Sequence, residues 1–361
     1  MNLEDKVRVT VHDLADGARF PDDLAAGARQ RGRRIRRRRQ AGVAAAAVAL
    51  VASASIPYAL LHRDEPAPQP QPQPAATTSR PIDWGKSPLT LPGKVIVTAV
   101  SRIDPRLADV PSADGSVVLD RRTGRYVQLP DDYHRVWGAP KVNRAVVSGD
   151  RHLGIIAANG EITWTDVTPG PDPQWSPDGT RVLATSGDGF AIIDAASGAV
   201  SRHATFDETY ACPDECRFTW LPDGKRVAIP VRDITADRSE AKLDMAVKVA
   251  IHDASTGKRL ETIPVPGAPA DQDAWSPDGR RVVLKHTSES GWANRVIFDV
   301  ETQQILADLG EQDAHFLPDG RLLGFDRPGA RVRLYDVRGR VLEEMSLPRS
   351  FANRTVSIGM P

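Results

Sequence analysis

The sequence predicts an all-β fold, a six-bladed β-propeller with a seven-bladed ring as the alternative, preceded by one transmembrane helix and a proline-rich linker. A five-residue motif that occurs four times, and a strand-and-turn motif that recurs between the copies, predict the propeller. An uncharged run behind a cluster of arginines predicts the helix. The expected parts are a basic cytoplasmic tail at 1–40, a transmembrane helix at 41–62, a proline-rich linker at 63–81 and the propeller at 82–361.

The first motif has the form aromatic-x-Pro-Asp-Gly, and each copy is followed by basic and then apolar residues. Proline presets φ in a type I turn, and glycine takes the left-handed position after it. The motif glycines lie 45, 55 and 41 residues apart, close to the length of a propeller blade. The repeated residues, to which we assign structural roles, are Trp175, Asp178, Gly179, Trp220, Asp223, Gly224, Trp275, Asp278, Gly279, Phe316, Asp319 and Gly320.

The second motif is a strand that ends in Asp and is followed by a short turn, which predicts a hairpin because Asp bonds the backbone two residues on. Its copies end at Asp120, Asp166, Asp194, Asp253, Asp299 and Asp336. Degenerate forms of the first motif, 91–93 and 137–140, complete two upstream units. The sequence therefore predicts six units, in which the motif aromatics pack between neighbouring blades.

These repeats resemble those of the TolB-type six-bladed propellers, relatives of the WD-repeat propellers, over residues 89–361. The resemblance implies the propeller fold and a habit of binding proteins or peptides. Because the motif Asp recurs from blade to blade, we interpret it as a turn residue and not as a catalytic one.

The membrane segment is predicted from 41–61, which holds no charged residue and is long enough to cross a bilayer core. Eight arginines between Arg29 and Arg39 precede it and one, Arg63, follows, so we expect the N-terminus in the cytoplasm and the propeller outside. The alternative is a cleaved signal peptide, because 52–54 has the small-x-small form of a cleavage site. Both readings place the propeller in an extracytoplasmic compartment.

The composition of the N-terminal part indicates two further features. Residues 66–74 alternate proline with alanine or glutamine, which favours a semi-rigid stalk. The order of features in 1–62 resembles the cytoplasmic heads of actinobacterial membrane proteins encoded beside extracytoplasmic-function sigma factors. That resemblance implies a cytoplasmic regulator bound at 1–40, and the alternative is a tail that only sets topology.

Candidate binding residues come from the longer connections, which meet on the face opposite the tight turns, where loops usually carry function. They are Tyr210, Arg217, Asp233 and Trp292. Cys212 and Cys216, the two cysteines of the chain, are expected to form a disulfide if the domain is exported.

Catalysis is not predicted, because the chain has no Gly-x-Ser-x-Gly elbow, no His-Glu-x-x-His helix and no phosphate loop. We expect no cofactor, no metal and no nucleic acid partner. Residues 1–63 hold 12 Lys/Arg against 6 Asp/Glu, so the remaining domain is net acidic and lacks the basic balance that phosphate binding requires. The first hypothesis is a membrane-anchored scaffold for a protein or cell-envelope ligand. The alternatives are a transmembrane signalling protein, and a hydrolase or lyase carried on the propeller.

Overall fold

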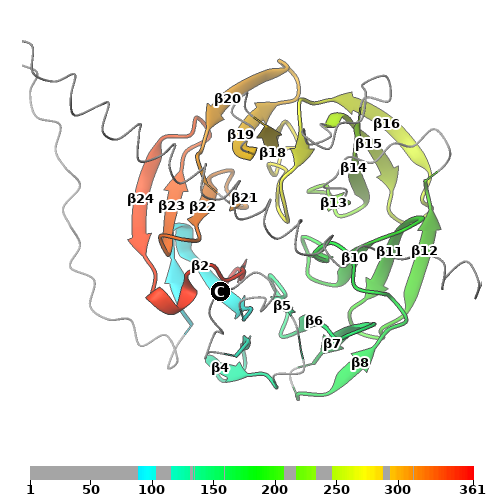
Figure 1. Ribbon diagram of the computed structural model, residues 1–361, viewed down its shortest axis with the longest axis vertical. Helices are drawn as coiled ribbons and strands as arrows, with labels where there is room; N and C mark the ends of the chain where they lie inside the picture. Colours follow the sequence, from blue (N-terminus) through cyan, green and yellow to red (C-terminus); the bar gives the residue numbers. More distant parts are fainter. Residues whose placement is uncertain are drawn as a thin grey trace, which may run out of the picture. The chain divides into compact units, whose positions relative to one another are not determined.

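The computed structural model describes residues 88–102, 115–130, 133, 135–157, 159–206, 217–232, 246–287, 293–311 and 313–361. In this part of the chain, antiparallel sheets follow one another around a ring (Figure 1). The predicted tail, transmembrane helix and linker at 1–81 lie outside the described residues. Within the described residues, no helix is both long and apolar enough to span a bilayer.

Five of the sheets are four-stranded meanders formed by consecutive strands. Blade two holds β5 Arg135–Gly138, β6 Ala145–Ser148, β7 Leu153–Ile156 and β8 Ile162–Trp164; blade three holds β9 Gln174–Trp175, β10 Arg181–Ser186, β11 Gly189–Asp194 and β12 Val200–Ala204. Blade four holds β13 Thr219–Trp220, β14 Arg226–Arg232, β15 Ala246–Asp253 and β16 Arg259–Pro264. Blade five holds β17 Ala268–Pro269, β18 Arg281–Thr287, β19 Ala293–Asp299 and β20 Gln304–Asp308, and blade six holds β21 Asp313–Phe316, β22 Leu322–Asp326, β23 Arg331–Tyr335 and β24 Val341–Ser346.

Blade one combines the two ends of the described chain. It contains β1 Thr90–Leu91, β2 Val95–Val100, β3 Val117–Asp120 and β4 Arg125–Gln128, joined by β25 Val356–Gly359, while the short 3-10 turns η1 Pro92–Lys94 and η2 Arg349–Phe351 lie beside them. These sheets number six, so the prediction of a six-bladed all-β propeller is confirmed and the seven-bladed alternative is wrong.

The first motif forms the turn between the first and second strands of a blade. In blade three, the carboxylate of Asp178 accepts the hydroxyl of Ser176 and the backbone N–H of Thr180. Gly179 follows with φ of 76° and donates its N–H to the carbonyl of Ser176 at 2.8 Å. An L side chain is disfavoured at this φ, which is why the motif ends in glycine.

The motif aromatics lie between neighbouring blades, as the sequence predicts. The indole Nε1 of Trp175 donates to the carbonyl of Trp137 in blade two at 3.0 Å. In the same way Trp220 donates to the carbonyl of Gln174 in blade three at 3.2 Å. Trp275 donates to the hydroxyl of Thr219 in blade four at 3.2 Å. Each tryptophan thus adds a directed bond to the apolar packing that joins two blades.

The second motif forms the turn between the third and fourth strands, with one exception. In blade four, for example, the Asp253 carboxylate accepts the backbone N–H groups of Ser255 and Thr256, and Gly257 closes the turn. The assignment of Asp166 to such a turn is wrong, because Asp166 follows the fourth strand, β8. In blade two the turn falls instead near Gly160, whose N–H donates to the carbonyl of Ala157.

The ring is closed by β25, which pairs with β2 on the edge opposite β3, since Val100 pairs with both Val356 and Val117. The predicted turn at 91–93 is present, but the strand before it, β1, lies on the β3 side of β2, because Ile96 pairs with both Thr90 and Gly359. The innermost strand of blade one therefore comes from the C-terminus and not from the start of the domain.

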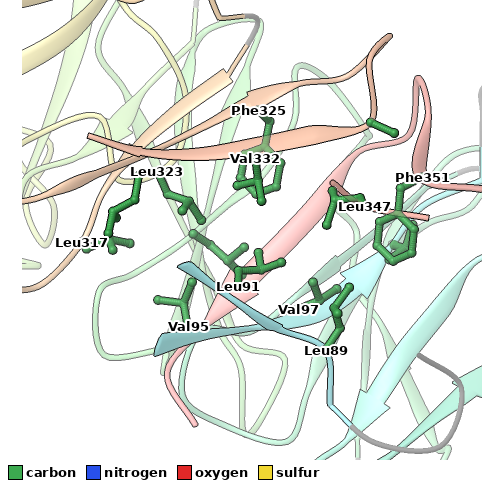
Figure 2. Close-up of a cluster of buried hydrophobic side chains, with 14 residues drawn as sticks. Leu89, Leu91, Val95, Val97, Leu317, Leu323, Phe325, Val332, Leu347 and Phe351 are labelled. Atoms are coloured by element: carbon green, nitrogen blue, oxygen red, sulfur yellow. The ribbon is translucent and has the colours of Figure 1, made fainter. Parts of the chain in front are cut away.

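An apolar cluster between blades one and six accompanies this closure. Figure 2 shows side chains of β22 and β23, among them Phe325 and Val332, facing Leu91 and Val97 of blade one, with Phe351 of η2 beside them. The buried cluster joins the last complete blade to the first, so the ring has no open side in the part of the chain that the structure describes.

Candidate functional site

The meander of each blade divides the propeller into two faces. The turns between strands one and two, and between strands three and four, lie on one face, called here the turn face. The connections between strands two and three, and between successive blades, lie on the other, called here the loop face. The space inside the innermost strands β5, β9, β13, β17, β21 and β25 is called here the channel, and it holds one hollow toward each face.

A bulge from blade five projects into the channel. Pro269 pairs with Leu284 and Trp275 pairs with Val282, so the five residues 270–274 stand opposite Val283 alone. The central residues of this stretch, Asp271–Asp273, are called here the channel bulge. Extra residues in one strand of an antiparallel pair bend that strand and redirect its side chains, an arrangement frequent beside functional sites.

Hydrogen bonds hold the channel bulge against two other blades. The side-chain Oε1 of Gln272 accepts the backbone N–H of Trp175 in blade three at 3.1 Å. The backbone carbonyl of Gln272 bonds His315 Nδ1 of blade six at 2.8 Å, and the carbonyl of Asp273 accepts the N–H of Phe316 at 2.8 Å. The bulge is therefore fixed across the channel and is not a free loop.

On the loop-face side of the bulge lies a small polar chamber of about 60 Å³. It is lined mainly by charged and amide side chains, among them Asp172, Gln174, Arg217, Asp271, Asp313, His315 and Arg327. Ion pairs run along its wall: Arg217 pairs with Asp271, Arg295 lies 3.5 Å from Asp271 and 3.9 Å from Asp313, and Arg327 pairs with Asp313. This chain of alternating charges links blades four, five and six.

The ion pairs keep Asp271 charged. Burial alone would raise the pKa of Asp271, but Arg217 and Arg295 on either side lower it below the ordinary value. The neighbouring carboxyl behaves in the opposite way, because burial dominates and raises the pKa of Asp273, against the smaller influence of His315. Among the described residues no arginine or lysine forms an ion pair with Asp273, so the two acids of one bulge have different chemistry.

On the turn-face side lies a larger apolar hollow of about 260 Å³, called here the proline cup. Its wall includes one proline from each of five turns between first and second strands: Pro140, Pro177, Pro222, Pro277 and Pro318. Aromatic and aliphatic residues of the same turns complete it, with Asp273 in its lining and the exposed Lys141 at its rim. The repeated Pro-Asp-Gly motif thus builds a second, unlike surface at the other end of the channel.

Of the four binding residues predicted from the sequence, the structure describes Arg217, which lies at the polar chamber and pairs with Asp271. Tyr210, Asp233 and Trp292 lie outside the described residues, as do Cys212 and Cys216.

The remaining chamber residues were missed by sequence reasoning, although a signal existed. A charged residue stands three positions before the motif aromatic in blades three, four and six, at Asp172, Arg217 and Asp313. Blade five has Asp271 four positions before Trp275.

Within the described part of the chain, no group of three or more His, Cys, Asp or Glu side chains is placed to hold a metal ion. The chamber is instead a hydrogen-bonding and ion-pairing surface. The amide of Gln174 is 97% buried, and neither its oxygen nor its nitrogen has a hydrogen-bond partner among the described residues. A buried amide without partners is costly, so it is a natural contact for a polar ligand group entering the chamber.

The strand order and the channel define the class of protein: a closed six-bladed β-propeller with a charged mouth on one face and an apolar mouth on the other. No protein-family model and no curated protein matches the chain. Among the solved structures that match, TolB from Acinetobacter baumannii shares 18% identity with a TM-score of 0.46, covering 73% of this chain and 65% of that one. The match therefore spans less than two thirds of that structure.

Proposed function

We propose that the chain is a membrane-anchored, extracytoplasmic and non-catalytic scaffold that binds a protein or cell-envelope ligand at its loop face. The observation that carries this proposal is the polar chamber, where charged residues of several blades converge at the loop-face mouth of the channel. The strand ends on the same face include those of β14 at Arg232, β15 at Ala246 and β18 at Thr287.

The route of the chain supports the assignment of the loop face. Pro88, the first described residue, lies 3.7 Å from the position of a Cβ on Gly124, which is in the turn between β3 and β4. Pro88 therefore lies on the turn face. The proposal assigns partner binding to the other face, which carries the polar chamber.

The ion pairs of the chamber make catalysis the weaker alternative. A general acid or base needs a pKa near the working pH, whereas the arginine neighbours of Asp271 lower its pKa; Asp273, whose pKa burial raises, is the exception among the chamber acids with a shifted pKa. Such paired charges are suited to orienting a partner and to excluding wrong ones.

Site-specific photocrosslinking in cells tests the proposal. A photoreactive residue replaces Asp188, exposed in the loop-face turn of blade three, or Ser197, exposed in a turn-face turn of the same blade. We expect a discrete adduct from position 188 and none from 197, and loss of the adduct when Arg217→Glu breaks the pair with Asp271. An adduct at 197 alone, or one indifferent to Arg217→Glu, contradicts the proposal.

The signalling alternative depends on residues 1–40, which lie outside the described residues. A pulldown with this segment as bait separates the two functions. Capture of a sigma-type regulator, lost when the segment is scrambled, would favour the signalling protein.

A further inference from the structure

The proline cup differs from the polar chamber in chemistry and faces the opposite way, so it calls for its own explanation. Most of its lining residues are apolar, and five separate turns contribute to its wall. Its one acidic lining residue is Asp273, which also borders the chamber and therefore lies where the two hollows meet. A concave apolar site with a single well-placed polar group is the usual form of a small-ligand site.

Asp273 is held in this place at an energetic cost. Its φ of 55° lies in the left-handed region, which non-glycine residues adopt rarely because it strains the backbone. The bulge is pinned in this shape by the bonds from Gln272 and Asp273 to blades three and six. The carboxylate itself receives only a long contact of 3.5 Å from Gln272 Nε2. A half-buried carboxylate that is held in a strained backbone and has so few protein partners can accept hydrogen bonds from a ligand.

The acids of the chamber wall offer the comparison. Asp172, Asp271 and Asp313 each pair with at least one arginine. Asp273 has no such partner among the described residues, and the nearest cationic influences on it are His315 and Lys141. Arginines compensate the negative charge of the three paired acids, whereas no arginine or lysine among the described residues forms an ion pair with Asp273.

From this placement we propose that the proline cup binds an organic cation with an apolar body, such as an alkylammonium group or a lysine side chain, whose ammonium pairs with Asp273. The apolar body lies against the prolines and against Trp220, Trp275 and Phe316. Pairing with an ammonium stabilises the ionised form of a carboxyl whose pKa burial otherwise raises. The proposal rests on the proline cup and on Asp273 in its lining, and it is independent of the function assigned to the loop face.

The cup contains a reporter of its own occupancy. Met360 lies in its lining, and the chain has four methionines, of which Met345 lies away from the cup in the outer strand β24. Methyl NMR of methionine-labelled full-length protein, with Met360 assigned by Met360→Leu, therefore separates binding in the cup from binding elsewhere. The probes are n-hexylammonium, 1-hexanol and hexanoate, which share one alkyl chain and differ in the charge of the head group.

We expect n-hexylammonium to shift the Met360 methyl resonance in a saturable way. Its affinity should be at least about tenfold higher than that of 1-hexanol, because a hydrogen bond between charged groups is stronger than one between neutral groups. Hexanoate should not bind. Affinity should rise about fourfold for each methylene from butyl to hexyl, as burial of apolar surface requires. Met345 should not respond.

Two substitutions give opposite results if the proposal holds. Asp273→Asn keeps size and polarity and removes the charge, so it should lower n-hexylammonium affinity at least about tenfold while leaving 1-hexanol unchanged. Because asparagine tolerates the left-handed region and avoids a buried charge, this variant should melt at or above the parent temperature at neutral pH.

Lys141→Gln removes from the rim a positive charge that repels the ammonium, so it should tighten the binding of n-hexylammonium. Equal affinity of the ammonium and the alcohol, or full binding by a folded Asp273→Asn variant, overturns the proposal.

Discussion

Arg354 offers the most direct test of how the ring is closed. It is 98% buried, and its guanidinium donates from Nε to the carbonyl of Ser101 at 2.7 Å and from Nη2 to the carbonyl of Gly115. Both acceptors belong to blade one, whereas Arg354 leads into β25, so these bonds join the C-terminus to the first blade. Hydrogen bonds to a charged group contribute about 1.5–3 kcal/mol each, so Arg354→Ala should lower the free energy of unfolding by about 3–5 kcal/mol.

A loss of this size is a large part of a typical stability of about 5–15 kcal/mol and should lower Tm by roughly 10 °C. Thermal and urea melts of residues 82–361 measure it. Arg349→Ala is the control, because Arg349 is exposed in η2, five residues away, and should change Tm by less than about 1 °C. Arg354→Lys should recover part of the loss, since one ammonium cannot reproduce the planar fork of the guanidinium. If Arg354→Ala melts within about 2 °C of the parent, closure does not depend on this residue.

Four further outcomes are expected. Removing blade six should abolish cooperative melting of the propeller, whereas replacing 234–244 by a short Gly-Ser link, which spares β14 and β15, should change Tm by less than about 2 °C. Non-reducing peptide mass spectrometry should find Cys212 and Cys216 linked, and two alkylatable thiols would refute that pairing. A reporter that works only in the cytoplasm should stay silent when fused after Pro361, and its activity would reverse the topology. Burial lowers the pKa of His252, so unfolding free energy should be greatest above about pH 6.5 and fall as pH drops toward the folded pKa, a fall that His252→Gln should reduce.

The blades could be predicted from the sequence because their signals are local. A Pro-Asp-Gly turn and an Asp-capped turn each fix their backbone within five residues. Both can be recognised in the sequence without knowing which distant strand pairs with them. The wrong assignment of Asp166 has the same origin. Blade two turns at Asn159-Gly160, a strong hairpin signal, but it lacks the strand-terminal Asp that marks the other blades.

Closure could not be predicted in this way, since it depends on pairing between residues far apart in the chain. Val356 and Val100 are neighbours in the sheet, yet nothing in the composition of β25 distinguishes an inner strand of blade one from a seventh unit. The ion pairs of the chamber are equally non-local: Arg217 and Asp271 come from adjacent blades. Charged residues before the motif aromatics indicate that a channel is polar, but only the ring shows which charges are paired.

The channel bulge shows how one departure from the repeat produces a distinctive group. In blade six, β21 pairs with β22 residue by residue, from Asp313 opposite Phe325 to Phe316 opposite Leu322. In blade five the additional residues cannot be accommodated in the ladder, so 271–273 leave the sheet and Asp273 adopts a left-handed backbone. The bulge places Asp271 beside Arg217 and Arg295, as Asp172 and Asp313 lie beside arginines in blades three and six. The same bulge places Asp273 in the lining of the proline cup, where no arginine or lysine of the described residues forms an ion pair with it, and this difference is the basis of the proposed cation site.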